Sequence, residues 1–185
     1  MSSELKIADK AFIDREEAPP EGYPAIAYHR TRDAYLVVWR DGSAQYGRFL
    51  QGDGRLAGDQ FDLNFCGSEE PLGCWRWRPA IDTPAVATRD ESDEFMVVYA
   101  TRDILHDESR LGSVIFGGDR LCVIADLAPA SDVGSVDVPS VEAAISYSPR
   151  DRKFLVVWEV NYAIPNQTDI HGTVMHALHG PMSCW

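Results

Sequence analysis

The hydrophobic pattern of the chain is dominated by one apolar phrase that occurs three times. It is "YLVVW" over residues 35–39, "FMVVY" over 95–99 and "FLVVW" over 154–158. A short apolar run without alternation is typical of a β-strand that is covered on both faces. We therefore expect three central strands, each buried from both sides, in three similar sheets.

The repeat extends on both sides of this phrase. Seven residues before its first letter stand Tyr28, Thr88 and Tyr147, each at the end of a run of small and apolar residues. After it come a polar loop and a segment that contains glycine: "YGRFLQGDG", "LGSVIFGGD" and "HGTVMHALHG". The first two copies continue with "LAGDQFDLNF" and "RLCVIADLAP". Enrichment in β-branched and aromatic residues between turn residues predicts four short strands per repeat.

The third repeat has no segment for a fourth strand before Trp185. At the other end of the chain, "KIADKA" at residues 6–11 matches "VIADLA" at 123–128 in the second repeat. We expect the N-terminal strand to complete the third sheet, because closure of this kind leaves no free sheet edge. One domain over 1–185 then holds repeats at about 24–83, 84–138 and 139–185 plus 1–23.

The predicted fold class is all-β: a β-propeller-like ring of three four-stranded repeats. Three blades are fewer than the four to eight that propellers usually have. Either the ring closes with three splayed blades, or two chains form a homodimer with six blades. A β-trefoil, which also has three-fold internal symmetry, is the alternative fold.

Composition narrows the range of partners. The 185 residues carry a formal net charge of −12, with lysine only at Lys6, Lys10 and Lys153. So acidic a chain lacks the attraction to phosphate that drives binding to nucleic acids or to anionic membranes. The N-terminus carries charges throughout and does not resemble a signal peptide, so we expect a cytoplasmic protein. Non-classical secretion stays open.

The four cysteines do not suggest a metal site. Cys66 and Cys74 flank a short loop, and no C-x-x-C pair occurs, which argues against structural zinc. We expect free thiols, and a local disulfide between Cys66 and Cys74 stays open for an oxidising compartment.

The motifs "PAIAY", "YLVVW", "QYGRFLQGDGRLAGDQFDLN" (45–64) and "DIHGTVM" (169–175) resemble the repeats of a bacterial family. This family occurs as tandem repeats in large secreted and surface proteins, including calcium-binding RTX-type adhesins. The resemblance covers nearly the whole chain. It implies a propeller-like arrangement used for binding or as a scaffold.

The segment "CWRWRP" is the first candidate for a binding site. Alternation in a strand would put two indoles on one face and two guanidinium groups on the other. Indoles can stack on a sugar or an aromatic ligand, and arginines can hold a carboxylate. We therefore predict binding of a small molecule or glycan; the alternative is that the indoles form a subunit contact. The residues are Trp75, Arg76, Trp77 and Arg78.

Oxygen-bearing residues follow each central strand, namely Asp41, Asp103, Glu159 and Asn161. Three such loops at one end of a ring could bind a hard cation, so calcium is the candidate cofactor. The alternative is that these residues are there to make turns.

Candidates for catalysis are few. His106, His171 and Glu159 could transfer protons, with or without a divalent cation beside them, but no nucleophile or phosphate-binding motif occurs. A ligand-binding module is therefore the first hypothesis for function. An enzyme with an axial site is the second, and an oligomerising scaffold is the third.

Overall fold

The computed structural model describes residues 24–41, 44–63, 77–79, 84–103, 108–117, 120–128, 142–161, 168–176 and 183–184. This part of the chain is all-β, in three antiparallel sheets, none of which is closed. Its one helical turn is a 3-10 turn at Asp90–Ser92. None of the described residues form a helix long and apolar enough to cross a membrane. The all-β prediction is confirmed.

The first sheet, called unit 1, has the order β1-β2-β3-β4. Its strands are β1 (Ala25–His29), β2 (Ala34–Asp41), β3 (Ala44–Gln51) and β4 (Phe61–Asp62). The fourth strand is only two residues long, and the chain reaches it after turning through Gly54 and Gly58, both at positive φ.

Unit 2 is built on β7 (Glu94–Asp103), which pairs with β6 (Ala85–Arg89) on one side and with β8 (Glu108–Gly117) on the other. The fourth strand is β9 (Arg120–Ala128). Two short strands extend this sheet. β5 (Trp77–Pro79) pairs with the far end of β7, and β13 (Ser183–Cys184) pairs with β9.

Unit 3 has the order β10-β11-β12, formed by Ala143–Ser148, Lys153–Asn161 and Thr168–His176. The predicted fourth strand of this unit, at residues 6–11, lies outside the described residues, so the closure of the ring stays a prediction. The C-terminal strand β13 joins unit 2, where Cys184 lies opposite Cys122.

The first hairpins of the three units share their register and one backbone angle. Tyr28 pairs with Tyr35, Thr88 with Phe95, and Tyr147 with Phe154. Each first hairpin turns through four residues, and the last residue of each turn is left-handed: Asp33 at φ 49°, Asp93 at 58° and Arg152 at 53°. The similarity that the structure shows therefore concerns these first hairpins, and the three-fold repeat of whole blades stays a prediction.

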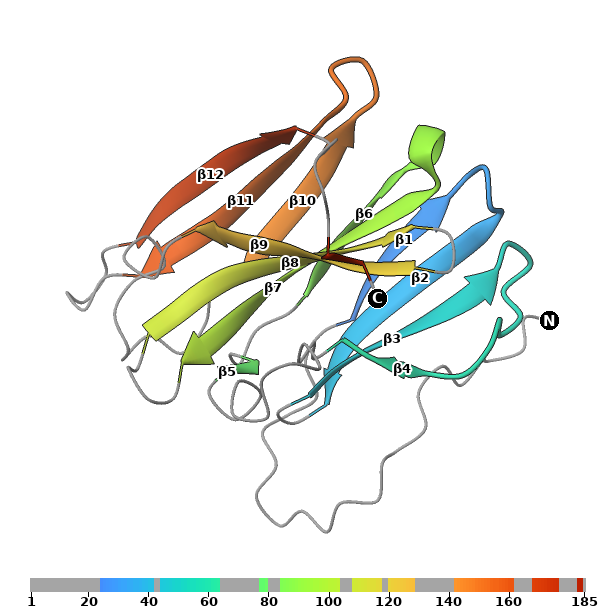
Figure 1. Ribbon diagram of the computed structural model, residues 1–185, viewed down its shortest axis with the longest axis horizontal. Helices are drawn as coiled ribbons and strands as arrows, with labels where there is room; N and C mark the ends of the chain where they lie inside the picture. The colour runs from blue at the N-terminus through green and yellow to red at the C-terminus, as the bar shows by residue number, and fades with distance from the viewer. Residues whose placement is uncertain are drawn as a thin grey trace, which may run out of the picture.

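The units stack in sequence order. β6 lies against β1 on one side and β10 on the other, and the three hairpin turns lie along the upper side of Figure 1. Side chains of a strand point alternately to the two sheet faces, so each unit has a face toward the preceding unit and one toward the following unit. We call these the N-side and C-side faces.

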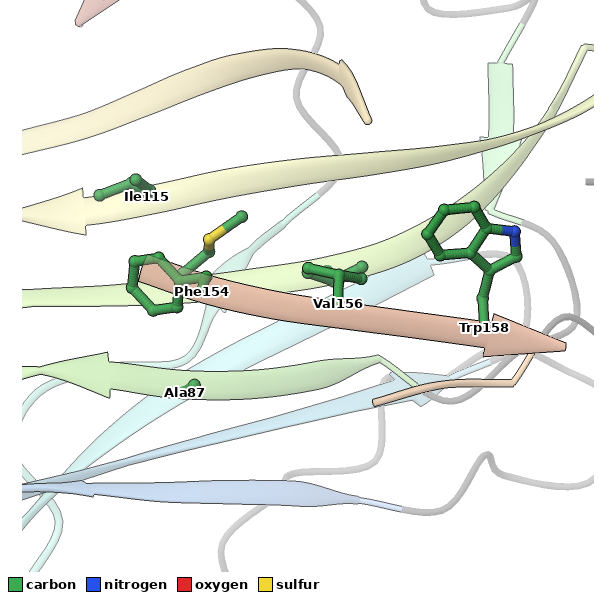
Figure 2. Close-up of a cluster of buried hydrophobic side chains, with 7 residues drawn as sticks. Ala87, Ile115, Phe154, Val156 and Trp158 are labelled. Carbon is green, nitrogen blue, oxygen red and sulfur yellow. The ribbon is translucent and has the colours of Figure 1, made fainter. Parts of the chain in front are cut away.

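Two hydrophobic clusters join the units. In the first joint, Leu36 and Val38 on the C-side face of unit 1 pack against Phe95 and Val97 on the N-side face of unit 2. In the second joint, the C-side face of unit 2 packs against unit 3, and Figure 2 shows Phe154, Val156 and Trp158 in a row along β11. Each joint therefore buries every second residue of two central strands.

The expected burial on both faces is confirmed for two of the three central strands. Leu36–Trp39 and Phe95–Val98 are buried throughout. In β11 the pattern alternates instead: Phe154 and Val156 are buried, whereas Leu155 is 47% exposed. The reason is that no following unit covers the C-side face of unit 3 within the described residues.

The second joint provides a test of the stacking. Phe154→Ala removes a side chain that is 1% exposed, so we expect the free energy of unfolding to fall by about 3–5 kcal/mol. Arg55→Ala is the control, because the Arg55–Asp53 ion pair is exposed and should contribute little. Urea unfolding at one fixed protein concentration measures both. Similar losses for the two variants would contradict the joint.

Candidate functional site

The residues predicted to bind a ligand are only partly placed. Trp75 and Arg76 lie outside the described residues. Trp77 and Arg78 belong to β5, where Trp77 lies opposite Asp103 and Arg78 opposite Arg102 of β7. The strand β5 thus lies at the end of unit 2 that is far from the hairpin turns. Ligand binding by this segment stays a prediction.

The predicted calcium ligands lie at the same end of each unit. Asp41 and Asp103 are the last residues of β2 and β7, and Asn161 is the last residue of β11. Glu159 lies two residues earlier in β11, opposite Ile170. No group of three or more metal-ligating His, Cys, Asp or Glu side chains occurs among the described residues, and calcium binding stays a prediction.

Of the predicted proton-transfer residues, the two that the structure describes, His171 and Glu159, do not lie together. His106 lies outside the described residues. His171 lies opposite Trp158, with ring centroids 6.1 Å apart, on the N-side face of unit 3. Glu159 is the next residue after Trp158, so it belongs to the opposite face. The sheet therefore separates the Glu159 carboxylate from the His171 imidazole.

The structure instead gathers polar side chains where the turns of units 1 and 2 meet. We call this cluster the turn joint. It is held by Arg32, whose guanidinium donates two hydrogen bonds to Asp93; Nη2 lies 2.7 Å from Oδ2. The same guanidinium lies 6.0 Å from the centroid of the Phe95 ring. Two-pronged contacts of this kind fix the position of both groups.

Asp90 supplies further contacts from unit 2 to the turn of unit 1. Its carboxylate accepts a hydrogen bond from the backbone N–H of Arg30 at 3.0 Å. Its carbonyl oxygen accepts one from Thr31 Oγ1 at 3.2 Å. A third bond, from Thr88 Oγ1 to the carbonyl oxygen of Tyr28 at 3.2 Å, links β6 to β1.

His29 is the fully buried member of the turn joint. Its Nδ1 accepts a hydrogen bond from the Arg32 backbone at 3.3 Å and lies 3.5 Å from Asp90 Oδ1. Its Nε2 lies 3.8 Å from Asp93 Oδ1 and has no hydrogen-bond partner among the described residues. The ring is shut off from solvent, and its contacts link the turns of units 1 and 2.

Units 2 and 3 are fastened at the equivalent place by a different pair. The Tyr147 hydroxyl donates a hydrogen bond to Glu91. This bond lowers the pKa of Glu91, aided by the charges of Arg89 and Arg152. The pKa of Tyr147 is raised, first by burial and then by the bond to Glu91. The sequence analysis predicted neither the Arg32–Asp93 contact nor the Tyr147–Glu91 contact. The signal that could have indicated them was the recurrence of charged residues in equivalent turns.

Comparisons with known proteins add nothing to this picture. A scan against models of known protein families gives no match, and a search of curated proteins finds no similar sequence. The resemblance to bacterial tandem repeats stays a prediction.

The ion pair in the turn joint predicts a pH dependence. The hydrogen bonds from Arg32 lower the pKa of Asp93, so its stabilising effect is complete above the unfolded pKa of about 3.9 and is lost as the pH falls through the folded value. Asp93→Asn should lower the free energy of unfolding by up to ~1 kcal/mol at pH 7, a difference that shrinks below about pH 4. Asparagine tolerates the left-handed backbone at this position.

The matched control is Asp53→Asn. Asp53 is also paired with an arginine, but within one exposed hairpin rather than between units. Chemical unfolding at several pH values measures both variants. If Asp93→Asn costs no more than Asp53→Asn at pH 7, or if the difference persists in acid, the turn joint does not fasten the units.

Proposed function

We propose that this chain is an assembly module made of propeller-like blades. Its three units stack side by side, and the C-side face of unit 3 binds a further blade. The observation that carries the proposal is the exposure of Leu155 and Val174 on this face, because their equivalents Leu36, Met96 and Ile115 are buried.

Cross-strand pairs make the comparison direct. Leu36 lies opposite Phe49 in unit 1, Met96 opposite Ile115 in unit 2, and Leu155 opposite Val174 in unit 3. Met96 is fully buried and Ile115 is 3% exposed, whereas Leu155 is 47% and Val174 is 55% exposed. The three units therefore have the same kind of apolar pair at this position, and only the pair in unit 3 is without cover from the described residues.

The apolar surface continues toward the end of the strands. Ile170 is 72% exposed, and Val157 is half-buried between Leu155 and Glu159. Covering Leu155, Ile170 and Val174 would stabilise a complex by roughly 1 kcal/mol for each side chain. Contiguous exposed apolar residues on a sheet face mark an interaction site.

The stacking supports propeller blades over the trefoil. Each unit is a separate antiparallel sheet, and the first strands of the units, β1, β6 and β10, lie next to one another. Neighbouring blades of a propeller pack through sheet faces around an axis in this way. A trefoil would instead combine its strands in one common barrel.

Two other functions stay predictions without support from the described residues. Ligand binding depends on Trp75, Arg76, Trp77 and Arg78, of which half are outside that part of the chain. An enzyme that uses His171 and Glu159 would need groups that lie on opposite faces of unit 3.

Light scattering coupled to size-exclusion chromatography tests the proposal. We expect the wild-type protein at about 50 µM to be larger than a monomer, and Val174→Glu to shift it to the monomer, because a carboxylate would have to be buried without a partner. Gln51→Glu is the control, since it adds the same charge at an exposed position of unit 1. A monomeric wild type, or an assembly that Val174→Glu leaves intact, contradicts the proposal.

A further inference from the structure

We infer that the further blade is unit 1 of a second copy of this chain, and that two copies join head to tail into a two-fold ring of six blades. The inference rests on the proposed assembly function and names its partner. In each of the two new joints, the C-side face of unit 3 would meet the N-side face of unit 1.

The first argument is where the exposed apolar side chains lie. Among the described residues, the large hydrophobic side chains that are exposed occur at the two ends of the array. On the C-side face of unit 3 they are Leu155, Ile170 and Val174, and on unit 1 they are Ile26, Tyr28 and Leu56. Leu56 bridges to Leu50, and Leu50 belongs to the N-side cluster of unit 1 with Val37 and Trp39. Both ends therefore offer apolar surface.

The second argument is that the N-side face of unit 1 has the residues of a joint. The rings of Tyr28 and Tyr35 pack in a tilted arrangement, with centroids 4.8 Å apart and an interplanar angle of 43°. Tyr147 and Phe154, at the equivalent positions of unit 3, pack in the same way, at 4.8 Å and 48°. The pair in unit 3 packs against unit 2. The same aromatic pair in unit 1 has no preceding unit to pack against among the described residues.

Ile26 shows the same relation. Its equivalents are Val86, which packs in the first joint, and Ile145, which packs in the second. Ile26 itself is 60% exposed. The centre of this face, formed by Val37 and Trp39, is already buried. Contact with a second copy would therefore bury the exposed side chains around that centre, such as Ile26.

The third argument is charge. In the second joint, Glu91 on the turn of unit 2 meets Tyr147 and the nearby charge of Arg152. At a joint between unit 3 and unit 1, the position of Glu91 is taken by Arg150, and that of Arg152 by Asp33. The signs are exchanged on both sides, so the attraction between this pair of positions is kept.

Further polar groups lie around Asp33 and Arg150 in their own units. The Tyr28 hydroxyl donates a hydrogen bond to Asp33 Oδ1 at 2.8 Å, so the carboxylate lies beside the aromatic pair. Arg150 is exposed. Asp151, which takes the position of Arg32 in the first joint, is acidic like Asp33, and it accepts a hydrogen bond from Ser148 Oγ at 2.9 Å. The cation that would offset these two carboxylates in the new joint is Arg150.

Closure follows from the number of units. Two chains of three units give six blades, within the four to eight that propellers usually have. Head-to-tail contacts close into a ring when the rotation fits and otherwise extend into a fibre. A two-fold ring uses both ends of each chain and leaves neither exposed.

A charge exchange between copies tests the pairing. Arg150→Glu makes two carboxylates face each other in both joints of its homodimer, and Asp33→Arg makes two guanidinium groups do so. Each variant alone should dimerise about tenfold more weakly than the wild type. Mixed in equal amounts, the two variants should form a heterodimer that is more stable than either homodimer. One of its joints pairs the two introduced charges with opposite sign, and the other keeps the original Arg150 and Asp33.

Arginine is tolerated at position 33, since Arg152 has the equivalent left-handed backbone. The heterodimer should therefore recover the affinity of the wild type. Native mass spectrometry and sedimentation velocity measure the outcome against twice the chain mass of 20.6 kDa. A dimer that is weakened by each variant and restored by mixing supports the ring.

The other outcomes overturn one proposal or both. A dimer that Val174→Glu breaks but that neither Arg150→Glu nor Asp33→Arg affects leaves the assembly function and overturns head-to-tail pairing in favour of two unit 3 faces in contact. A monomeric wild type overturns both, and an open fibre overturns closure.

Discussion

A sheet that is apolar on both faces must be covered on both faces, and this constraint organises the molecule. The central strand of unit 2 meets it fully, because Phe95, Met96, Val97 and Val98 are shielded by unit 1 on one side and by unit 3 on the other. The neighbours of unit 2 each share only one joint. When like units stack, the outer faces of the first and last units are therefore the ones that no neighbouring unit covers.

Within the array, the apolar faces and the hairpin turns have different roles in joining the units. The faces of the units are similar, so packing alone would allow a unit to join any other. The turns differ: Arg32 meets Asp93 in the first joint, and Tyr147 meets Glu91 in the second. Contacts of this kind contribute little affinity at a surface but penalise wrong partners, since like charges would then face each other. The turns therefore distinguish the two joints, whereas the apolar faces do not.

Much of the fold follows from the sequence, because the repeat fixes the alignment of strands within each unit. The pairing of Tyr28 with Tyr35, and of its equivalents, agrees with strands placed by the repeat, although the sequence analysis did not name these pairs. The uncovered face of unit 3 was not, since an apolar pattern shows that a residue needs cover but not whether cover is present. The turn joint was equally hidden, because Arg32 and Asp93 are far apart in sequence. The separation of Glu159 from His171 becomes clear only once Trp158 is known to lie opposite His171.

The end faces distinguish this chain from a capped repeat protein. In solenoids, terminal repeats have a polar outer face that ends the array. Here unit 3 ends in Leu155, Ile170 and Val174, and unit 1 in Ile26 and Tyr28, all exposed. Neither end is a cap, so the described array has the surface of an interior segment. The formal net charge of −12 makes copies repel each other at long range, and a place where a cation meets an anion would reduce that repulsion on contact. Arg150 and Asp33 are such a cation and anion, one at each end.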